Sequence, residues 1–156
     1  MDRPRQRVTG SPVIRIERLS GEGLARHLDG LASLRIRVFR DYPYLYDGDA
    51  GYEAWYVAEF ASAPGAVVVA ALDGERLVGA ATASPMSAQK EEFSAPIARL
   101  GLSVDDLFYF GESVLLPEYR GRGIGHEFFA AREAAAREQG FARAGFYSVI
   151  RPPDHP

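Results

Sequence analysis

The chain has 156 residues, is 47% apolar, and carries 18 basic and 21 acidic side chains, which gives a net charge of -3. A chain of this length buries most of its surface on folding, so we expect one globular domain with a hydrophobic core. The slight negative charge argues against nucleic acid or an anionic membrane as a partner, because both are attracted by positive fields. Cysteine is absent, which excludes disulfides, thiolate zinc sites and a cysteine nucleophile.

The N-terminal segment MDRPRQRVTGSP is polar and lacks the apolar centre of a signal peptide. No uninterrupted apolar run approaches the length of a membrane span. We expect residues 1–11 to form a disordered tail and residues 12–156 to form a single domain, in a cytoplasmic protein.

The first half of the domain predicts one strand followed by two helices. Residues 12–19 alternate in the period of a half-buried strand, and Ser20 is placed to cap a helix. Apolar residues then recur at helical spacing over 24–38, with Gly30 as a possible break. Aromatic and apolar positions indicate a second helix over 52–60.

The second half predicts a hairpin, a strand, a helix and a last strand. Two β-rich runs meet at Asp73-Gly74, and a polar stretch with a short helix follows them. The remaining predicted elements are a strand over 107–116, a helix over 124–139 with Gly140 just after its end, and a strand over 142–150. The run REAAARE (132–138) is interpreted as the solvent-facing side of that helix. The result is a mixed α/β architecture.

Between the strand and helix of the second half lies RGRGIG (120–125), in which three glycines alternate with other residues. Glycines let backbone amides approach an anion closely, and the first amides of a helix lack intrahelical acceptors. Arg120 and Arg122 could add charge-assisted hydrogen bonds. A tight turn with solvated arginines is the alternative, but the strand, the spacing and the helix start together favour an anion site.

Two common phosphate-binding motifs fit this segment poorly. A P-loop would continue with Lys and Ser/Thr, whereas Gly125 is followed by His126 and Glu127. A dinucleotide fingerprint needs its third glycine one position later and an acidic residue at the end of the next strand. The sequence has His126 and FYSVI at those places.

The stretch PEYRGRGIG resembles the (Gln/Arg)-x-x-Gly-x-(Gly/Ala) signature of the GNAT superfamily of N-acetyltransferases, with Arg120, Gly123 and Gly125 at the signature positions. The order of predicted elements from Ile14 to Ile150 is also similar to that family's fold. The resemblance implies a mostly antiparallel central sheet flanked by helices in the order β-α-α-β-β-β-α-β. It also implies an N-acetyltransferase that uses acetyl-coenzyme A (acetyl-CoA).

By this resemblance, the glycine loop holds the pyrophosphate of acetyl-CoA and the preceding strand binds the pantetheine arm. Val114 and Leu115 would contact pantetheine through their main chains, and their amides are candidate oxyanion donors. The residues implied for the pyrophosphate are Arg120, Gly121, Arg122, Gly123, Ile124, Gly125 and His126.

Acetyl transfer to an amine needs a base and a polarised carbonyl. Glu112 lies in an apolar and aromatic run, where the surroundings could raise its pKa toward that of a base, and many members of the resembled family carry a glutamate in this strand. A sheet glutamate paired with an arginine is the alternative. Tyr147 and Ser148, on the neighbouring predicted strand, could face the acetyl group, although the sequence favours a packed tyrosine.

The connection RDYPYLYDGD between the two predicted helices gathers aromatic and acidic side chains. Such a lip could accept a cationic amine through cation–π contacts and charge complementarity. Packing of the tyrosines and capping of turns by the aspartates is the alternative. The candidate substrate residues are Tyr42, Tyr44, Tyr46 and Asp47.

The C-terminal end departs from the resembled family. There the tyrosine that commonly acts as general acid lies on a helix after the fifth strand, and two further strands follow, whereas this sequence ends at Pro156. We expect a C-terminally incomplete domain with no assigned acid, a homodimer in which a second chain covers the edge of the last strand, or a reduced variant of the fold. The three histidines, His27, His126 and His155, share no metal-ligand spacing, so no metal is expected.

The predicted function is transfer of an acetyl group to a primary amine of a small-molecule or peptide acceptor. Direct attack by the amine is expected because no cysteine can carry an acetyl intermediate. A non-catalytic acyl-CoA binding or sensing module is the alternative. A structural interaction domain without a ligand is the third hypothesis.

Overall fold

The computed structural model describes residues 13–41 and 44–148, and these form one five-stranded sheet in the order β1-β2-β3-β4-β5. All neighbouring strands are antiparallel except β4 and β5, which run parallel. The strands are β1 (Ile14–Leu19), β2 (Val67–Asp73), β3 (Arg76–Pro85), β4 (Leu107–Leu115) and β5 (Arg143–Gly145). The predicted tail over residues 1–11, Tyr42 and His155 lie outside the described residues.

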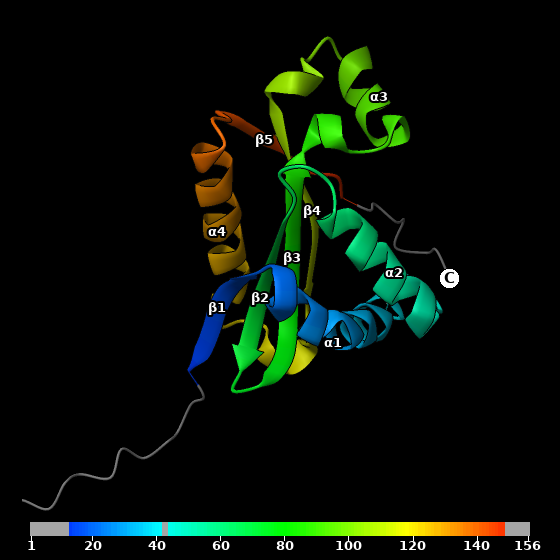
Figure 1. Cartoon of the computed structure of the whole chain (residues 1–156), viewed down its shortest axis with the longest axis vertical. Coiled ribbons are helices and arrows are strands. Elements are labelled where there is room, and N and C mark those ends of the chain that lie inside the picture. Colours follow the sequence, from blue (N-terminus) through cyan, green and yellow to red (C-terminus); the bar gives the residue numbers. More distant parts are fainter. Residues whose placement is uncertain (1–12, 42–43, 149–156) are drawn as a thin grey trace, which may run out of the picture.

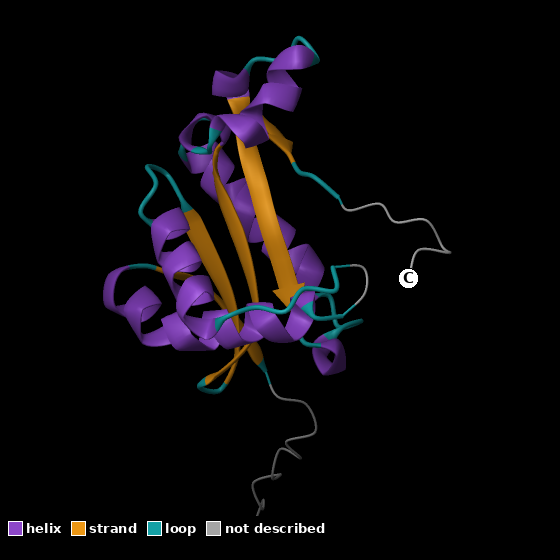
Figure 2. Ribbon diagram, turned by 90° about the vertical axis from the view of Figure 1, so that its right-hand side faces the viewer, coloured by secondary structure: helices purple, strands orange, loops and turns teal. Residues whose placement is uncertain are grey.

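Helices cover both faces of the sheet. The helices are α1 (Gly21–Phe39), α2 (Ala50–Ala61), α3 (Glu91–Arg99) and α4 (Ile124–Glu138), with 3₁₀ turns at Met86–Ala88, Val104–Asp106 and Pro117–Tyr119. Helices α1 and α2 lie on one face and α4 on the other, while α3 sits at one end of the sheet (Figures 1 and 2). The predicted mixed α/β fold and its order of elements are confirmed, with α3 as the short helix between β3 and β4.

The possible break at Gly30 does not occur, and the predicted last strand differs from the structure. Helix α1 continues through Gly30, because the apolar stripe of Leu31, Leu34 and Val38 is buried against the sheet and holds the helix together. Within the described residues the last strand is limited to Arg143–Gly145, shorter than the predicted 142–150, of which Val149 and Ile150 lie outside the described residues. Beyond Gly145 the ring of Phe146 packs on Phe129 of α4, 6.0 Å between centroids, and residues 146–148 do not pair with β4.

The ladder between β3 and β4 contains a β-bulge. Ala81 pairs with Ser113 and Ala83 with Phe110, so Gly111 and Glu112 both lie opposite Thr82. The Thr82 hydroxyl accepts a hydrogen bond from the Glu112 N–H at 2.9 Å. A Cβ on Gly111 would lie 2.4 Å from Thr82 Oγ1, so only glycine leaves room for this contact.

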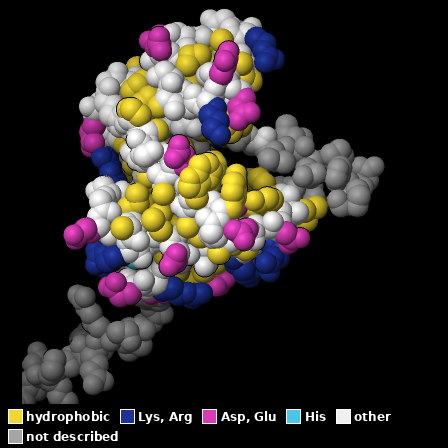
Figure 3. All heavy atoms as spheres, turned by 45° about the vertical axis from the view of Figure 1, so that its right-hand side comes forward, with side chains coloured by type: hydrophobic (Ala, Val, Ile, Leu, Met, Phe, Trp, Pro, Cys, Tyr) yellow, Lys and Arg dark blue, Asp and Glu magenta, His cyan; other side chains and the backbone are white. Residues whose placement is uncertain are grey.

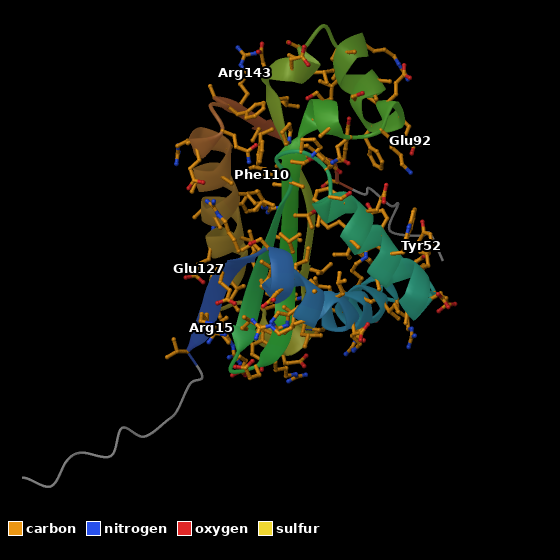
Figure 4. The ribbon with its side chains drawn as sticks, in the orientation of Figure 1. Arg15, Tyr52, Glu92, Phe110, Glu127 and Arg143 are labelled. Atoms are coloured by element: carbon orange, nitrogen blue, oxygen red, sulfur yellow. The ribbon has the colours of Figure 1, made fainter. Side chains whose placement is uncertain are left out.

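The extra residue changes which face of the sheet the following side chains occupy. Phe110 packs against α4, as its contact with Phe129 at 5.8 Å shows, and strict alternation would put Glu112 on the same face (Figure 4). Instead Glu112 contacts Arg35 of α1, and Ser113 contacts Arg132 of α4. The bulge therefore sends a carboxylate to one face and a hydroxyl to the other, side by side at the point where β5 leaves the sheet.

The bulge generates a stability prediction. We expect Gly111→Ala to lower the free energy of unfolding by about 1–3 kcal/mol, because the new methyl group overlaps the Thr82 side chain and forces a backbone shift. The double variant Gly111→Ala with Thr82→Ala removes the clashing hydroxyl and should recover part of that loss, as urea unfolding would measure. Additive losses in the double variant would contradict the close packing of these two residues.

Candidate active site

A cavity of about 570 Å³ opens where β4 and β5 separate. It reaches both faces of the sheet at this edge, because residues of α1 and of α4 line it together. The side chains that matter for its chemistry are Arg35, Tyr44, Tyr46, Glu112, Ser113 and Arg132. The bulge thus lies in the wall of the cavity, and Glu112, predicted as a base from the sequence, faces into it.

Glu112 belongs to a charged cluster with Arg35 of α1 and Glu53 of α2. Arg35 forms an ion pair with Glu112 through one terminal nitrogen and bonds Glu53 Oε2 through Nε at 2.5 Å. The Glu53 side chain is 1% exposed and that of Glu112 is 27% exposed. The arginine alternative considered for Glu112 is therefore present. A neighbouring guanidinium favours the charged form of a carboxylate, opposite to the effect expected from apolar surroundings alone.

Two carboxylates share a single guanidinium in this cluster, which leaves one net negative charge beside the cavity. Arg35 is held over the rings of Tyr56 and Phe39, 4.5 and 5.1 Å from their centroids. Packing on both sides fixes the guanidinium plane, so the position of Glu112 depends on α1 and α2 as well as on its own strand.

The connection between α1 and α2 brings two of the four predicted substrate residues to the cavity. Tyr44 and Tyr46 line it and are 43% and 41% exposed. Tyr46 interacts with the Glu53 carboxylate, chiefly by donating a hydrogen bond to it, and this interaction raises the pKa of Tyr46. Asp47 points away from the cavity: its side chain is 96% exposed and its nearest cation is Arg40 at 3.9 Å. Figure 3 shows hydrophobic side chains gathered on one face of the molecule, with acidic side chains among them.

The glycine loop starts α4 in the way the sequence predicts. Gly121 and Gly123 have φ of +77° and +80°, a backbone conformation that other residues rarely adopt, and Gly123 is the N-cap of α4. No atom lies within 4 Å of a Cβ built on Gly121, Gly123 or Gly125, so the loop is open on its outer side. The free N–H groups of the first turn, those of Ile124, Gly125 and His126, complete a site suited to an anion.

The loop arginines brace the loop in this structure. Arg120 donates from Nε and one terminal nitrogen to the Leu115 carbonyl at 3.2 and 3.1 Å, and Arg122 donates to the Glu118 carbonyl at 3.1 Å. Tyr119, beneath the Arg122 guanidinium, donates its hydroxyl to Asp73 in the β2–β3 hairpin at 2.5 Å, and this bond raises the pKa of Tyr119. The two guanidinium groups therefore add charge at the loop while their hydrogen bonds hold its shape.

The β4 ladder separates the two predicted pantetheine contacts. Leu116 donates its N–H to the Val78 carbonyl at 2.9 Å, and hydrogen-bonded pairs alternate along an antiparallel ladder. Val114 therefore pairs with Ala80, whereas the backbone groups of Ser113 and Leu115 point away from β3 toward the open edge. The geometry favours Leu115 over Val114 as a main-chain partner for a ligand.

Tyr147 and Ser148 lie beyond the end of β5 and not on a strand, which corrects their predicted setting. Tyr147 lines the cavity, and its hydroxyl donates to the Phe93 carbonyl of α3 at 2.5 Å. Ser148 is exposed and does not line the cavity. Tyr109, beside Tyr147 at 6.0 Å between ring centroids, has its pKa raised by burial.

Sequence reasoning missed Arg35, Glu53 and Arg132. Arg132 opens the run interpreted as solvent-facing, yet it is 1% exposed. The signal was available in the spacing, because Arg132 follows Ile124 and Phe128 at four-residue steps on the buried stripe of α4. Arg35 likewise follows Leu31 by four residues on the buried stripe of α1.

Two further findings apply to the described part of the chain. No helix there is long and apolar enough to cross a membrane. Within residues 13–41 and 44–148, no group of three or more histidine, aspartate or glutamate side chains is placed to hold a metal ion.

The fold resembles those of several solved acetyltransferases. The aminoglycoside N-acetyltransferase AAC(6')-Iy in complex with CoA superimposes with a TM-score of 0.67 at 16% identity, covering 91% of this chain and 81% of that one. The aminoglycoside acetyltransferase meta-AAC0020 from an uncultured soil metagenomic sample, in complex with sisomicin, gives 0.59 at 20% identity, covering 87% and 78%. A ribosomal-protein-alanine N-acetyltransferase from Brucella melitensis biovar Abortus 2308 gives 0.59 at 16% identity, covering 91% and 84%.

At these identities the structural likeness establishes the fold. A search of curated protein sequences found no match. The family model described as "Acetyltransferase (GNAT) family" matches residues 31–155, which include the glycine loop, the bulge and the cavity. The chain therefore belongs to the GNAT family of acetyltransferases, which use acetyl-CoA as the acyl donor.

Proposed function

We propose that this protein is an N-acetyltransferase that moves an acetyl group from acetyl-CoA to a primary amine by direct attack. The observation that carries the proposal is the order of three features along β4 and α4: the open glycine loop, the unpaired edge of β4 at Ser113 and Leu115, and the cavity that contains Glu112. The loop amides and guanidinium charges would hold the pyrophosphate, and Leu115 would pair with the pantetheine arm through its N–H, since its carbonyl already accepts from Arg120.

The charge of the cavity supports a cationic acceptor. The cluster of Glu53, Arg35 and Glu112 has a net negative charge, and Tyr44 and Tyr46 present exposed rings at the same opening. Carboxylates and aromatic faces both attract an ammonium group. The aminoglycoside and ribosomal-protein acetyltransferases of similar fold act on amines of a small molecule and of a protein, so both acceptor classes stay within the proposal.

Glu112 is proposed as the base that takes a proton from the attacking amine. Arg35 forms an ion pair with its carboxylate, and the bulge holds the strand at this residue through the bond from Glu112 N–H to Thr82. The carboxylate faces a cavity large enough for a small acceptor or a bridging water. Tyr147 and Ser148 remain proposals as groups near the acetyl end, with Tyr147 the better placed of the two.

A second candidate function is a non-catalytic acyl-CoA binding module. The ion pair between Arg35 and Glu112 favours it, because an ion-paired carboxylate is a weaker base than one in apolar surroundings. Both functions require acetyl-CoA to bind at the glycine loop, and they differ in whether an amine acceptor releases coenzyme A.

Cofactor binding is tested by placing a negative charge at the loop. We expect Gly125→Glu to weaken acetyl-CoA binding at least about tenfold in isothermal titration, because a carboxylate would face the pyrophosphate across the open side of the loop. The fold should persist, since Gly125 has ordinary φ and an acidic residue is favourable in the first turn of a helix. Gly125→Gln is the matched neutral control and should bind more tightly than Gly125→Glu. Equal affinities for Gly125→Glu and the wild type would contradict this site.

The role of Glu112 is tested by its neutral isostere. We expect Glu112→Gln to lower kcat/KM by about 10²–10⁴-fold, with the acetyl-CoA dissociation constant unchanged. The loss should be largest below neutral pH, where more of the amine is protonated and a base is needed most. Glu133→Gln, on the exposed side of α4, is the control. An unaltered pH–rate profile in Glu112→Gln would remove Glu112 as the base.

A further inference from the structure

Arg132 is a buried cation in an unusual setting. It projects from α4 toward β3 and β4 and is 1% exposed. Among residues 13–41 and 44–148, no carboxylate lies within ion-pair distance of it, and burial lowers the pKa of its guanidinium to about 10. A buried charge without a partner of opposite sign is unfavourable, so its retention on the core stripe of α4 calls for an explanation.

The hydrogen-bond partners of Arg132 are all neutral. It donates to the carbonyls of Phe128 at 3.3 Å, Thr82 at 3.4 Å and Glu112 at 3.5 Å, and to Ser113 Oγ at 2.9 Å. The rings of Phe110 and Phe129 cover its faces at 4.8 and 4.7 Å. These contacts fix the guanidinium rigidly, but they do not compensate its charge.

Ser113 connects this charge to the cavity. The bulge turns Ser113 to the α4 face, where its side chain is exposed and lines the cavity. Its oxygen accepts from Arg132, so its own hydroxyl proton is available for a second partner. A hydroxyl that accepts from a cation is a stronger donor than an isolated one.

Ser113 and Arg132 also lie some distance from the glycine loop, in the direction that the pantetheine arm would take from it. Arg132 follows Ile124 by eight residues, which places it roughly 12 Å along α4 from the glycine loop. The free edge of β4 from Leu115 to Ser113 spans about 7 Å. A pantetheine arm anchored at the loop would therefore bring its sulfur toward Ser113.

We propose that Ser113 and Arg132 together stabilise the coenzyme A thiolate as it leaves, an inference that rests on the proposed function. In the transfer, the amine lone pair forms the C–N bond, and the electron pair of the C–S bond moves to sulfur. The proton lost by nitrogen goes to the base. Ser113 then donates a hydrogen bond to the sulfur without giving up its proton, and Arg132 supplies the positive charge behind it.

The hydrogen bonds of Arg132 suit a leaving thiolate better than a carboxylate carried by the acyl group of the donor. Four of the five N–H groups of Arg132 already have acceptors, so no free fork remains for bidentate binding of a carboxylate. A thiolate needs only one donor and a nearby positive charge. A dicarboxylic acyl donor thus fits this arrangement less well than an acetyl group.

The other charged and titratable groups at the cavity belong to its remaining walls. Glu112 is on the opposite face of β4 and is paired with Arg35, which limits its repulsion of an anion near Ser113. The four other such side chains that line the cavity are Tyr44, Tyr46, Tyr109 and Tyr147. The pKa values of Tyr46 and Tyr109 are raised, so both stay neutral where a thiol with a lowered pKa ionises.

The test compares coenzyme A with desulfo-coenzyme A, which lacks the thiol, by isothermal titration at about pH 6.5 and about pH 8.5. If the bound thiol has a lowered pKa, binding releases a proton and the preference for coenzyme A over desulfo-coenzyme A rises with pH. We expect that preference to rise about tenfold in the wild type. The preference for coenzyme A over desulfo-coenzyme A should rise less with pH in Ser113→Ala and not at all in Arg132→Met.

Controls separate this effect from folding and from the proposed function. Ser103→Ala, an exposed serine without a side-chain cap bond, should behave as the wild type. Affinity for desulfo-coenzyme A reports whether each variant keeps its binding site, and Ser113→Ala carries the test if Arg132→Met does not fold. A preference independent of pH in the wild type, or an equal rise in Ser113→Ala and the wild type, would overturn the inference alone. Absence of coenzyme A binding would overturn the proposed function with it.

Discussion

Two residues of β4 face one residue of β3, and the chemistry of the site depends on that single irregularity. Because side chains alternate strictly along a regular strand, a bulge is the economical way to reverse the faces of all the residues that follow. Gly111 makes the bulge possible by leaving room for the Thr82 hydroxyl, which bonds the Glu112 amide. The carboxylate of Glu112 and the hydroxyl of Ser113 consequently point to opposite faces within one cavity.

Two buried arginines give those faces opposite character. Arg35 is shared by two carboxylates and leaves the acceptor side of the cavity negative. Arg132 has only neutral hydrogen-bond partners and leaves the α4 side positive. The proposed reaction would bring in an ammonium group and expel a thiolate, and charges of these two signs in these two places suit it. Strand β4 also keeps the negative cluster around Arg35 apart from Arg132. A direct ion pair between the two sides would neutralise both charges.

The parts of the site that follow local rules could be predicted from the sequence. The glycine loop needs positive φ at Gly121 and Gly123 and a helix directly after it, and both requirements are legible in RGRGIG. The hairpin at Asp73-Gly74 and the length of α4 follow from turn chemistry and periodicity in the same way. Long-range contacts decided the rest. Three features depend on contacts between elements that are far apart in the sequence: the burial of Arg132, the sharing of Arg35 by two carboxylates and the early end of β5. No local sequence pattern specifies such contacts.

The central claim is that acetyl transfer to an amine takes place in this cavity. The most direct measurement is the release of the coenzyme A thiol from acetyl-CoA by the purified full chain, recorded with a panel of small-molecule and peptide amines. The account predicts thiol release that depends on the amine and that Glu112→Gln suppresses while acetyl-CoA still binds. Binding of acetyl-CoA with no amine-dependent release across the panel would contradict it and would identify the protein as an acyl-CoA binding module.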